Sequence, residues 1–472
     1  MGELAWAWGM ADAIWLADVV AREAMLFAAI GFLIGGVDDL AIDLLWITRR
    51  FFRSATVYRR HARATLQDFA MPTGRYAMLV PAWDEGDVIA RMLASMLARL
   101  PHAQLVVFVG AYVNDPATVA AVADVAARDH RVMLVINPRP GPTTKADNLN
   151  AMWRAVERHE AATDARFHAI ILHDAEDVIA TGEIRAFEHL LRRADIVQLP
   201  VLPLVDRGSR WISGHYCDEF AEAHVKAMVV REALGAALPL AGTGFAIRRA
   251  LMAKLADARN GAPFDAASLT EDYELGLAVG RFGARAMLAR VAACPGGPTI
   301  AVRAHFPATL EAAVRQKARW MTGIALAGWD RVGWSHWRER GLRENWMRMR
   351  DRRALVAVIV LALAYVGLVA WALGTALAFI AGTPAPGLDV PLALLVANGV
   401  LMVWRLAMRA ALVTRCYGWR EGVRSVPRAF VANWVAMLAA RRAIVRYLSM
   451  LRGQAAQWDK TSHVFPDVLP AE

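Results

Sequence analysis

The sequence predicts an α/β domain with a mostly parallel sheet, embedded between transmembrane helices. Two observations lead to this fold class. Between about residues 75 and 305, short apolar runs alternate with amphipathic, alanine-rich stretches, the usual pattern of a parallel sheet with crossover helices. The chain is also unusually apolar: of its 472 residues, 57% are hydrophobic and 21% are charged, a balance that favours a membrane protein over a soluble enzyme.

Three stretches are long enough to span a bilayer, which takes about 20 residues. They are residues 24–47, 354–380 and 391–413. Basic residues follow the first, precede the second and follow the third, which places these flanks in the cytoplasm. Residues 1–23 are then expected in the periplasm or its interface, and residues 48–310 form a cytoplasmic domain. Residues 311–353 and 414–472, rich in Trp or Arg, are expected at the cytoplasmic membrane surface.

Net charge and cysteine content argue against a nucleic-acid partner and against a structural zinc site. The formal net charge is +10, and a basic excess in a membrane protein usually faces anionic lipid, so no nucleic-acid partner is expected. The three cysteines, Cys217, Cys294 and Cys416, lack metal-ligand spacing. A reducing compartment is favoured, and a structural zinc site is not.

Five apolar runs are predicted as strands: residues 76–82, 105–111, 131–137, 168–174 and 195–201. The fourth delivers three carboxylates, Asp174, Glu176 and Asp177, to one point. Packed like charges raise one another's pKa, so a positive partner should lie among them. The carboxyl ends of parallel strands are also where open α/β sheets bind ligands. A divalent cation that holds a phosphorylated ligand would meet both conditions, although capping of a turn or helix is the simpler alternative for such a cluster alone.

Five further motifs accompany this cluster. In chain order, they are "VPAWDEGDVI", "TTKADNLNAMW", "LAGTGFAIRR", "LTEDYELGL" and "RQKARW". Together they resemble the family 2 glycosyltransferases of the processive, membrane-embedded type, such as cellulose and hyaluronan synthases, over about residues 76–320. The resemblance implies a GT-A fold, which is Rossmann-like with a mostly parallel sheet, and places the acceptor site in residues 311–353.

The resemblance also implies how the donor is held. Ala82 and Glu85 stand where the family contacts the nucleobase, and Lys145 stands near the nucleotide. Asp174 and Glu176 replace the usual Asp-x-Asp pair, which grips a diphosphate through Mg²⁺ or Mn²⁺. Oxygen ligands suit such a hard cation.

The remaining motifs imply the catalytic and acceptor residues. Asp272, beside Glu271, looks like the general base, and Gln316, Arg319 and Trp320 match the family's Gln-x-x-Arg-Trp signature. A sugar hydroxyl needs a carboxylate to take its proton, Arg can pair with diphosphate oxygens, and Trp offers an apolar face to a sugar ring. Simpler alternatives are helix capping by the two acids, a basic interfacial helix at "RQKARW" and a solvated Lys145.

The second strand departs from the family pattern. Most relatives end it with an Asp-Asp pair that helps to hold the nucleoside, whereas Gly110 and Ala111 occupy that place here. Asn114 or Asp115 is the expected substitute. With "DAED", "VGAYVNDPAT" and "QWDKTSHVF", the chain most resembles the phage-adsorption protein B subgroup, which is tied to exopolysaccharide production and export.

Four charges inside the predicted spans require partners. Asp39 and Asp43 lie at depths similar to those of Arg405 and Arg409. Because charges in lipid normally pair, Asp39 is expected to pair with Arg405 and Asp43 with Arg409. The arginines could instead snorkel to the interface or contact the glycan or an anionic lipid-linked acceptor.

The sequence therefore predicts an inverting glycosyltransferase of the bacterial inner membrane. It would extend an exopolysaccharide from a nucleotide sugar, with UDP as the expected nucleotide, and couple synthesis to export. Expected partners are a glycan or lipid-linked acceptor, the bilayer and an outer-membrane or periplasmic export protein. Three spans are few for a glycan channel, so a homodimer or partner protein could complete it. The alternatives are a catalytically lapsed scaffold of an envelope secretion or phage-receptor assembly, and a single-sugar transferase to a lipid carrier.

Overall fold

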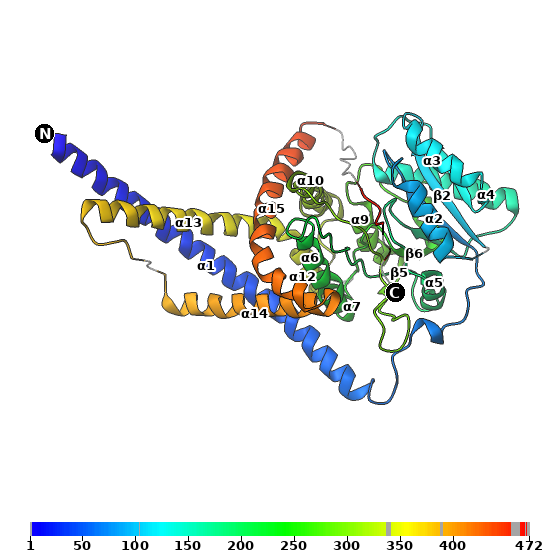
Figure 1. The fold of residues 1–472 in the computed structure, drawn as a ribbon, viewed down its shortest axis with the longest axis horizontal. Helices are drawn as coiled ribbons and strands as arrows, with labels where there is room; N and C mark the ends of the chain where they lie inside the picture. Colours follow the sequence, from blue (N-terminus) through cyan, green and yellow to red (C-terminus); the bar gives the residue numbers. More distant parts are fainter. Residues whose placement is uncertain are drawn as a thin grey trace.

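The computed structural model contains an α/β domain and three long helices that project from it (Figure 1). It describes residues 2–102, 104–336, 341–387, 390–454, 463–467 and 469, with side chains from residue 9 onward. Part of the predicted tail, residues 455–462, lies outside this range, as do residues 337–340 of the predicted interfacial region.

A mostly parallel seven-stranded sheet forms the centre of the domain, in the order β3-β2-β1-β4-β6-β5-β7. Only β6 runs antiparallel to its neighbours. The strands are β1 Tyr76–Pro81, β2 Leu105–Tyr112, β3 Val132–Asn137, β4 Ala169–Leu172, β5 Ile196–Gln198, β6 Phe245–Arg248 and β7 Ala286–Leu288. All five predicted strands are present, which confirms the α/β prediction. β6 and β7, which are four and three residues long, were not predicted.

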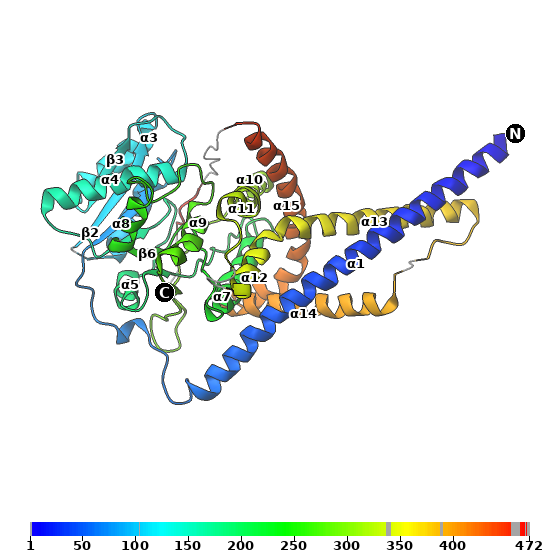
Figure 2. The ribbon, with the colours of Figure 1, turned by 180° about the vertical axis from the view of Figure 1, so that it is seen from behind.

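Helices cover both faces of the sheet, so its central strands are buried, as in most parallel sheets (Figure 2). Tyr76, Met78 and Val80 of β1 face one layer, and Ala77 and Leu79 face the other. The first layer contains α2 Ile89–Arg99, α3 Pro116–Ala126 and α5 Glu183–Leu191; the second contains α4 Lys145–Thr163, α8 Arg249–Asp257 and α9 Glu271–Ala278.

The domain contains further helical elements, and α6 Gly214–Glu222, α7 Met228–Ala233, α10 Leu310–Met321 and α12 Gly341–Arg352 lie between the sheet and the long helices (Figure 1). The others are η1 Leu66–Asp68, η2 Ala223–Ala227, η3 Val279–Phe282, η4 Thr322–Leu326 and α11 Ala327–Val332. Two of them, η2 and η4, are single π-helical turns. Such turns are often found at functional sites.

Within the part of the chain that the structure describes, three helices are long and apolar enough to cross a membrane. They are α1 Gly2–Thr56, α13 Ala354–Ala381 and α14 Leu392–Tyr417. α1 runs toward the domain, α13 runs away from it and α14 returns (Figure 1). α1 extends well beyond residues 24–47 at both ends, and near its C-terminal end Ile42 packs against Val230 and Met347 of the domain.

The predicted charge pairs are half right. Arg405 lies 3.3 Å from Asp39, as predicted. Asp39 also pairs with Arg350 of α12 and with Arg353, which directly follows this helix. The pair of Asp43 with Arg409 was wrong. Asp43 instead accepts from Lys226 of η2 at 2.5 Å and from Trp404 of α14 at 2.9 Å, whereas Arg409 pairs with Glu222 of α6 at 2.5 Å.

The last helix, α15 Trp419–Leu451, packs against α10 and α14. Its fully buried Arg428 contacts Asp218 of α6 at 2.7 Å and Glu421 at 2.8 Å. Burial raises the pKa of Asp218 to about 7, although the Arg428 guanidinium opposes this shift. A buried ion pair therefore attaches α15 to α6.

Candidate active site

A cavity of about 530 Å³ opens between the carboxyl edge of the sheet and the helices that face the long helices. Nine of the eleven predicted site residues line it: Glu85, Lys145, Asp174, Glu176, Glu271, Asp272, Gln316, Arg319 and Trp320. The fold therefore brings residues as far apart in the chain as Glu85 and Trp320 to the same cavity.

Ala82 and Asp115 do not line the cavity. Ala82 is fully buried, and its N–H donates to the carbonyl of Gly110 at 2.8 Å. Asp115 caps α3 and also accepts from the backbone N–H of Asp84 at 2.5 Å. These two residues therefore support the loop that carries Glu85.

The structure gives a steric reason for the glycine in the second strand. The side-chain amide of Asn148 donates to the carbonyl of Gly110 at 2.8 Å. A Cβ atom on Gly110 would lie only 2.3 Å from Asn148 Oδ1. Asn148 thus occupies space that a larger side chain at position 110 would need.

Lys145 supplies positive charge to the acidic cluster. Thr144 caps α4 and places Lys145 in its first turn, from which Nζ donates to Asp174 Oδ1 at 2.5 Å and to the carbonyl of Gly242 at 3.1 Å. Glu271 Oε1 lies 4.0 Å away. Burial lowers the pKa of Lys145, but the carboxylates of Asp174, Glu271 and Asp272 outweigh it and raise the pKa. Lys145 therefore remains charged.

A buried network beneath the cluster was missed by the sequence analysis. His173 contacts Asp177 at 2.9 Å through Nδ1 and Glu183 at 3.0 Å through Nε2. Burial lowers the pKa of His173, but these two carboxylates together raise it to about 10. Asp177 also accepts from Thr243 and from the backbone N–H of Asp174. The network joins the acidic loop to the loop at Gly242.

Glu271 and Asp272 begin α9 and point into the cavity region beside Lys145. Burial raises the pKa of both carboxyl groups, and the Lys145 ammonium opposes the shift. A carboxylate whose pKa is raised toward neutrality is a better proton acceptor for a hydroxyl group.

Gly242 separates Lys145 from Asp272. It has a φ of +78°, and a Cβ atom there would lie 2.9 Å from Asp272 Oδ2. We expect Gly242→Ala to displace Asp272 and to lower turnover at this site at least about tenfold, in addition to a strain of roughly 1–2 kcal/mol. The matched control is Gly235→Ala, because Gly235 has a φ of +73° and no atom within 4 Å of the added Cβ. Equal activity of the two purified variants would contradict this prediction.

α10 forms the opposite wall of the cavity. Thr309 caps this helix, which carries Gln316, Arg319 and Trp320 on one side. The Trp320 ring packs near those of Tyr216 and Phe220, with centroids 6.0 and 6.1 Å away. Tyr216 is fully buried, whereas Trp320, Phe220 and Phe306 line the cavity, and these three rings can accept the apolar face of a sugar.

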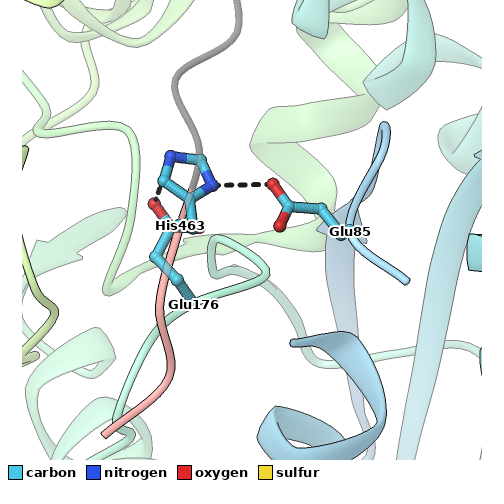
Figure 3. A group of neighbouring side chains, drawn as sticks. All are labelled: Glu85, Glu176 and His463. Atoms are coloured by element: carbon cyan, nitrogen blue, oxygen red, sulfur yellow. Dashed lines mark hydrogen bonds and ion pairs between the residues drawn. The ribbon is translucent and has the colours of Figure 1, made fainter. Parts of the chain in front are cut away.

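A second group of polar side chains could hold a cation. Ligand atoms of Glu85, Glu176 and His463 lie within 4.8 Å of one another (Figure 3). The group does not include Asp174, whose carboxylate contacts Lys145. Burial raises the pKa of Glu176, as do the neighbouring Asp174 and Glu85, while His463 opposes them. Two carboxylates and an imidazole are a suitable donor set for a divalent cation. His463 lies in the "QWDKTSHVF" segment noted above, but its position in the cavity was not predicted.

Comparison with known proteins places the chain in a glycosyltransferase family. The family described as "glycosyltransferase like family 2" matches residues 72–323. Bacteriophage adsorption protein B of Escherichia coli K12 and bacteriophage N4 adsorption protein B of E. coli O157:H7 are each 36% identical over 485 aligned residues, which cover 96% of this chain and 64% of each relative. This chain therefore spans just under two-thirds of their length.

Among solved structures, a mannosyltransferase from Pyrobaculum calidifontis in complex with GDP-mannose and Mn²⁺ matches with a TM-score of 0.51 and 17% identity. The match covers 94% of this chain and 100% of that one. At this identity the likeness concerns the fold alone, and it agrees with the predicted GT-A fold.

Proposed function

The chain belongs to glycosyltransferase family 2, and on that premise we propose that it is an inverting transferase of the bacterial inner membrane. It moves a sugar from a nucleotide donor, expected to be a UDP-sugar, onto a growing exopolysaccharide whose synthesis is coupled to export. The observation that carries the proposal is the cavity itself. It brings the acidic loop, the start of α9 and the α10 residues together at the carboxyl edge of the sheet.

In the proposed reaction, the two walls of the cavity have different roles. On the sheet side, Asp272 takes the proton of the acceptor hydroxyl as this oxygen attacks the sugar carbon, and the nucleoside diphosphate leaves from the opposite face. This single displacement inverts the sugar carbon and needs no protein nucleophile. Lys145 balances the charge of Asp174 and Glu271 beside the base.

On the α10 side, Trp320 stacks on the acceptor sugar, Gln316 binds its hydroxyl groups and Arg319 pairs with the diphosphate. Arg319 is proposed for this role because it lines the same cavity as Asp174 and Glu176. A divalent cation, Mg²⁺ or Mn²⁺, held by Glu176 with Asp174 nearby, would neutralise the diphosphate charge.

We also propose the membrane arrangement that the flanking charges predict. The domain-proximal ends of α1, α13 and α14 (Figure 1) lie on the cytoplasmic side in this proposal, because basic residues such as Arg49, Arg350 and Arg415 stand near these ends in the chain. The cavity reaches Ile42 of α1 and Met347 of α12. An acceptor that enters from the membrane side would therefore reach Asp272 without crossing the sheet.

A donor panel tests the proposal. The purified protein in lipid is given UDP- and GDP-sugars, with Mg²⁺ or Mn²⁺ or with neither, and release of the nucleoside diphosphate is measured. We expect metal-dependent release from one UDP-sugar and a polymeric product. If the product carried only one added sugar, the protein would be a single-sugar transferase to a carrier and would not be a polymerase. Neither binding nor release of any donor would contradict the transferase and favour the scaffold alternative.

A further inference from the structure

A cluster of arginines lies where the C-terminal end of α1 meets the α/β domain. Arg49 and Arg53 are near the end of this helix, and Arg63 follows it closely in the chain. Arg290 comes from a distant part of the chain, just after β7. The fold therefore adds a fourth arginine to the three that the basic stretch after a membrane span supplies by itself.

Tyr58 lies among these arginines. Its hydroxyl accepts from Arg53 at 3.0 Å, and the guanidinium groups of Arg53 and Arg63 lie 5.2 and 4.3 Å from its ring centroid. Burial raises the pKa of Tyr58, but Arg53, Arg63 and Arg290 outweigh it and lower the pKa. A phenol whose pKa falls in this way lies in a field that favours negative charge on an oxygen atom.

The protein does not balance the charge of this cluster. Within the described part of the chain, Arg49, Arg53 and Arg63 form no ion pair with a carboxylate, and Arg290 lies 3.9 Å from Glu232. The buried Nε atoms of Arg49 and Arg53 have no hydrogen-bond partner there. Burial lowers the pKa of Arg290; Glu232 opposes the shift, and Arg49 and Arg53 add to it. An additional anion would balance the excess positive charge.

We propose that this cluster binds the phosphate of an anionic phospholipid headgroup. Phosphate oxygens suit the planar fork of arginine, which donates several hydrogen bonds. The cluster also lies at the end of a helix that is long and apolar enough to cross a membrane, a usual position for binding anionic lipid.

Exposed aromatic side chains beside the cluster favour a lipid over a free phosphate. Phe51 and Phe52, which lie between Arg49 and Arg53 in α1, are 75% and 64% exposed. Adjacent exposed rings of this kind suit the boundary between headgroups and acyl chains. None of the four arginines lines the active-site cavity, so the lipid site does not depend on the proposed transferase.

Native mass spectrometry of the full-length protein in a nonionic detergent, with phosphatidylglycerol added, provides the test. We expect one tightly bound phosphatidylglycerol and weaker binding of the zwitterionic phosphatidylcholine. Arg53→Gln and Arg290→Gln should each weaken phosphatidylglycerol binding about tenfold or more, because each removes charge-assisted hydrogen bonds. The double variant should lose less than the product of the two single losses, because both arginines bind one phosphate.

The matched control is the double variant Arg59→Gln and Arg60→Gln, because both side chains are exposed in the same basic stretch. It should change the affinity for phosphatidylglycerol less than about twofold, as expected for exposed charges. Without lipid, Arg290→Gln should melt at the wild-type temperature or above it, because it removes repulsion from Arg49 and Arg53. Loss of lipid binding at an unchanged melting temperature would therefore not reflect unfolding.

Three results would overturn the proposal. Equal weakening by the control and by Arg53→Gln would show general charge attraction without a built site. Unchanged phosphatidylglycerol binding in Arg290→Gln would show that the arginine brought by the fold takes no part. Displacement of the lipid by inorganic phosphate at an equal concentration would show that the ligand is a free anion and not a headgroup.

Discussion

Asp272→Asn is expected to lower nucleotide release and sugar transfer by about 10²- to 10⁴-fold, because an amide cannot take the proton of the acceptor hydroxyl. The variant keeps the size of the side chain beside Gly242 and Lys145. Donor binding, measured by calorimetry on the same protein in lipid, should therefore change much less than turnover. A loss of turnover with retained binding is the signature of a residue that acts in the transition state.

Two control variants sharpen this result. Asp257→Asn removes an exposed carboxylate at the end of α8 and should leave turnover unchanged. Glu271→Gln removes the other buried acid beside Lys145 and should have a smaller effect than Asp272→Asn. If Glu271→Gln abolished release and Asp272→Asn retained it, the base would be Glu271.

Arg428→Met is expected to destabilise the packing of α15 by about 3–5 kcal/mol, because it leaves the buried Asp218 without its ion-pair partner and removes one of the two arginines that pair with Glu421. Methionine has a similar length, so little packing volume is lost. The pKa of Asp218, raised by burial to about 7 while Arg428 opposes the shift, should rise further in the variant. The loss of stability would be measured as a lower melting temperature and faster proteolysis at α15, with wild type and variant in one detergent.

Arg424→Met is the matched control in the same helix. Arg424 also pairs with Glu421, but its side chain is 35% exposed. A pair at such a position contributes roughly 0–1 kcal/mol, so the melting temperature should hardly change. Equal destabilisation by the two variants would show that burial does not decide the strength of these contacts.

The sequence by itself determined the features that depend on short stretches of chain. The runs at β1, β2 and β3 are six to eight residues long and apolar, and they were predicted almost to their ends. The spans of α13 and α14 follow from length and hydropathy in the same way. Six motifs in a fixed order carry the resemblance to family 2 glycosyltransferases, and this resemblance implied that Lys145, Asp174 and Asp272 belong to one site.

Only the tertiary structure decided which partner each charged group has. Lys145 contacts Asp174 across 29 residues, Asp43 contacts Lys226 across 183, and His463 contacts Glu85 across 378. A local pattern cannot choose among such partners, because the choice depends on which elements pack between them. Lys226 of η2 pairs with Asp43 and Glu222 of α6 pairs with Arg409, and Phe465, buried in the core, anchors the segment that brings His463 to Glu176. Burial and packing, which are properties of the whole fold, therefore set the chemistry of the site.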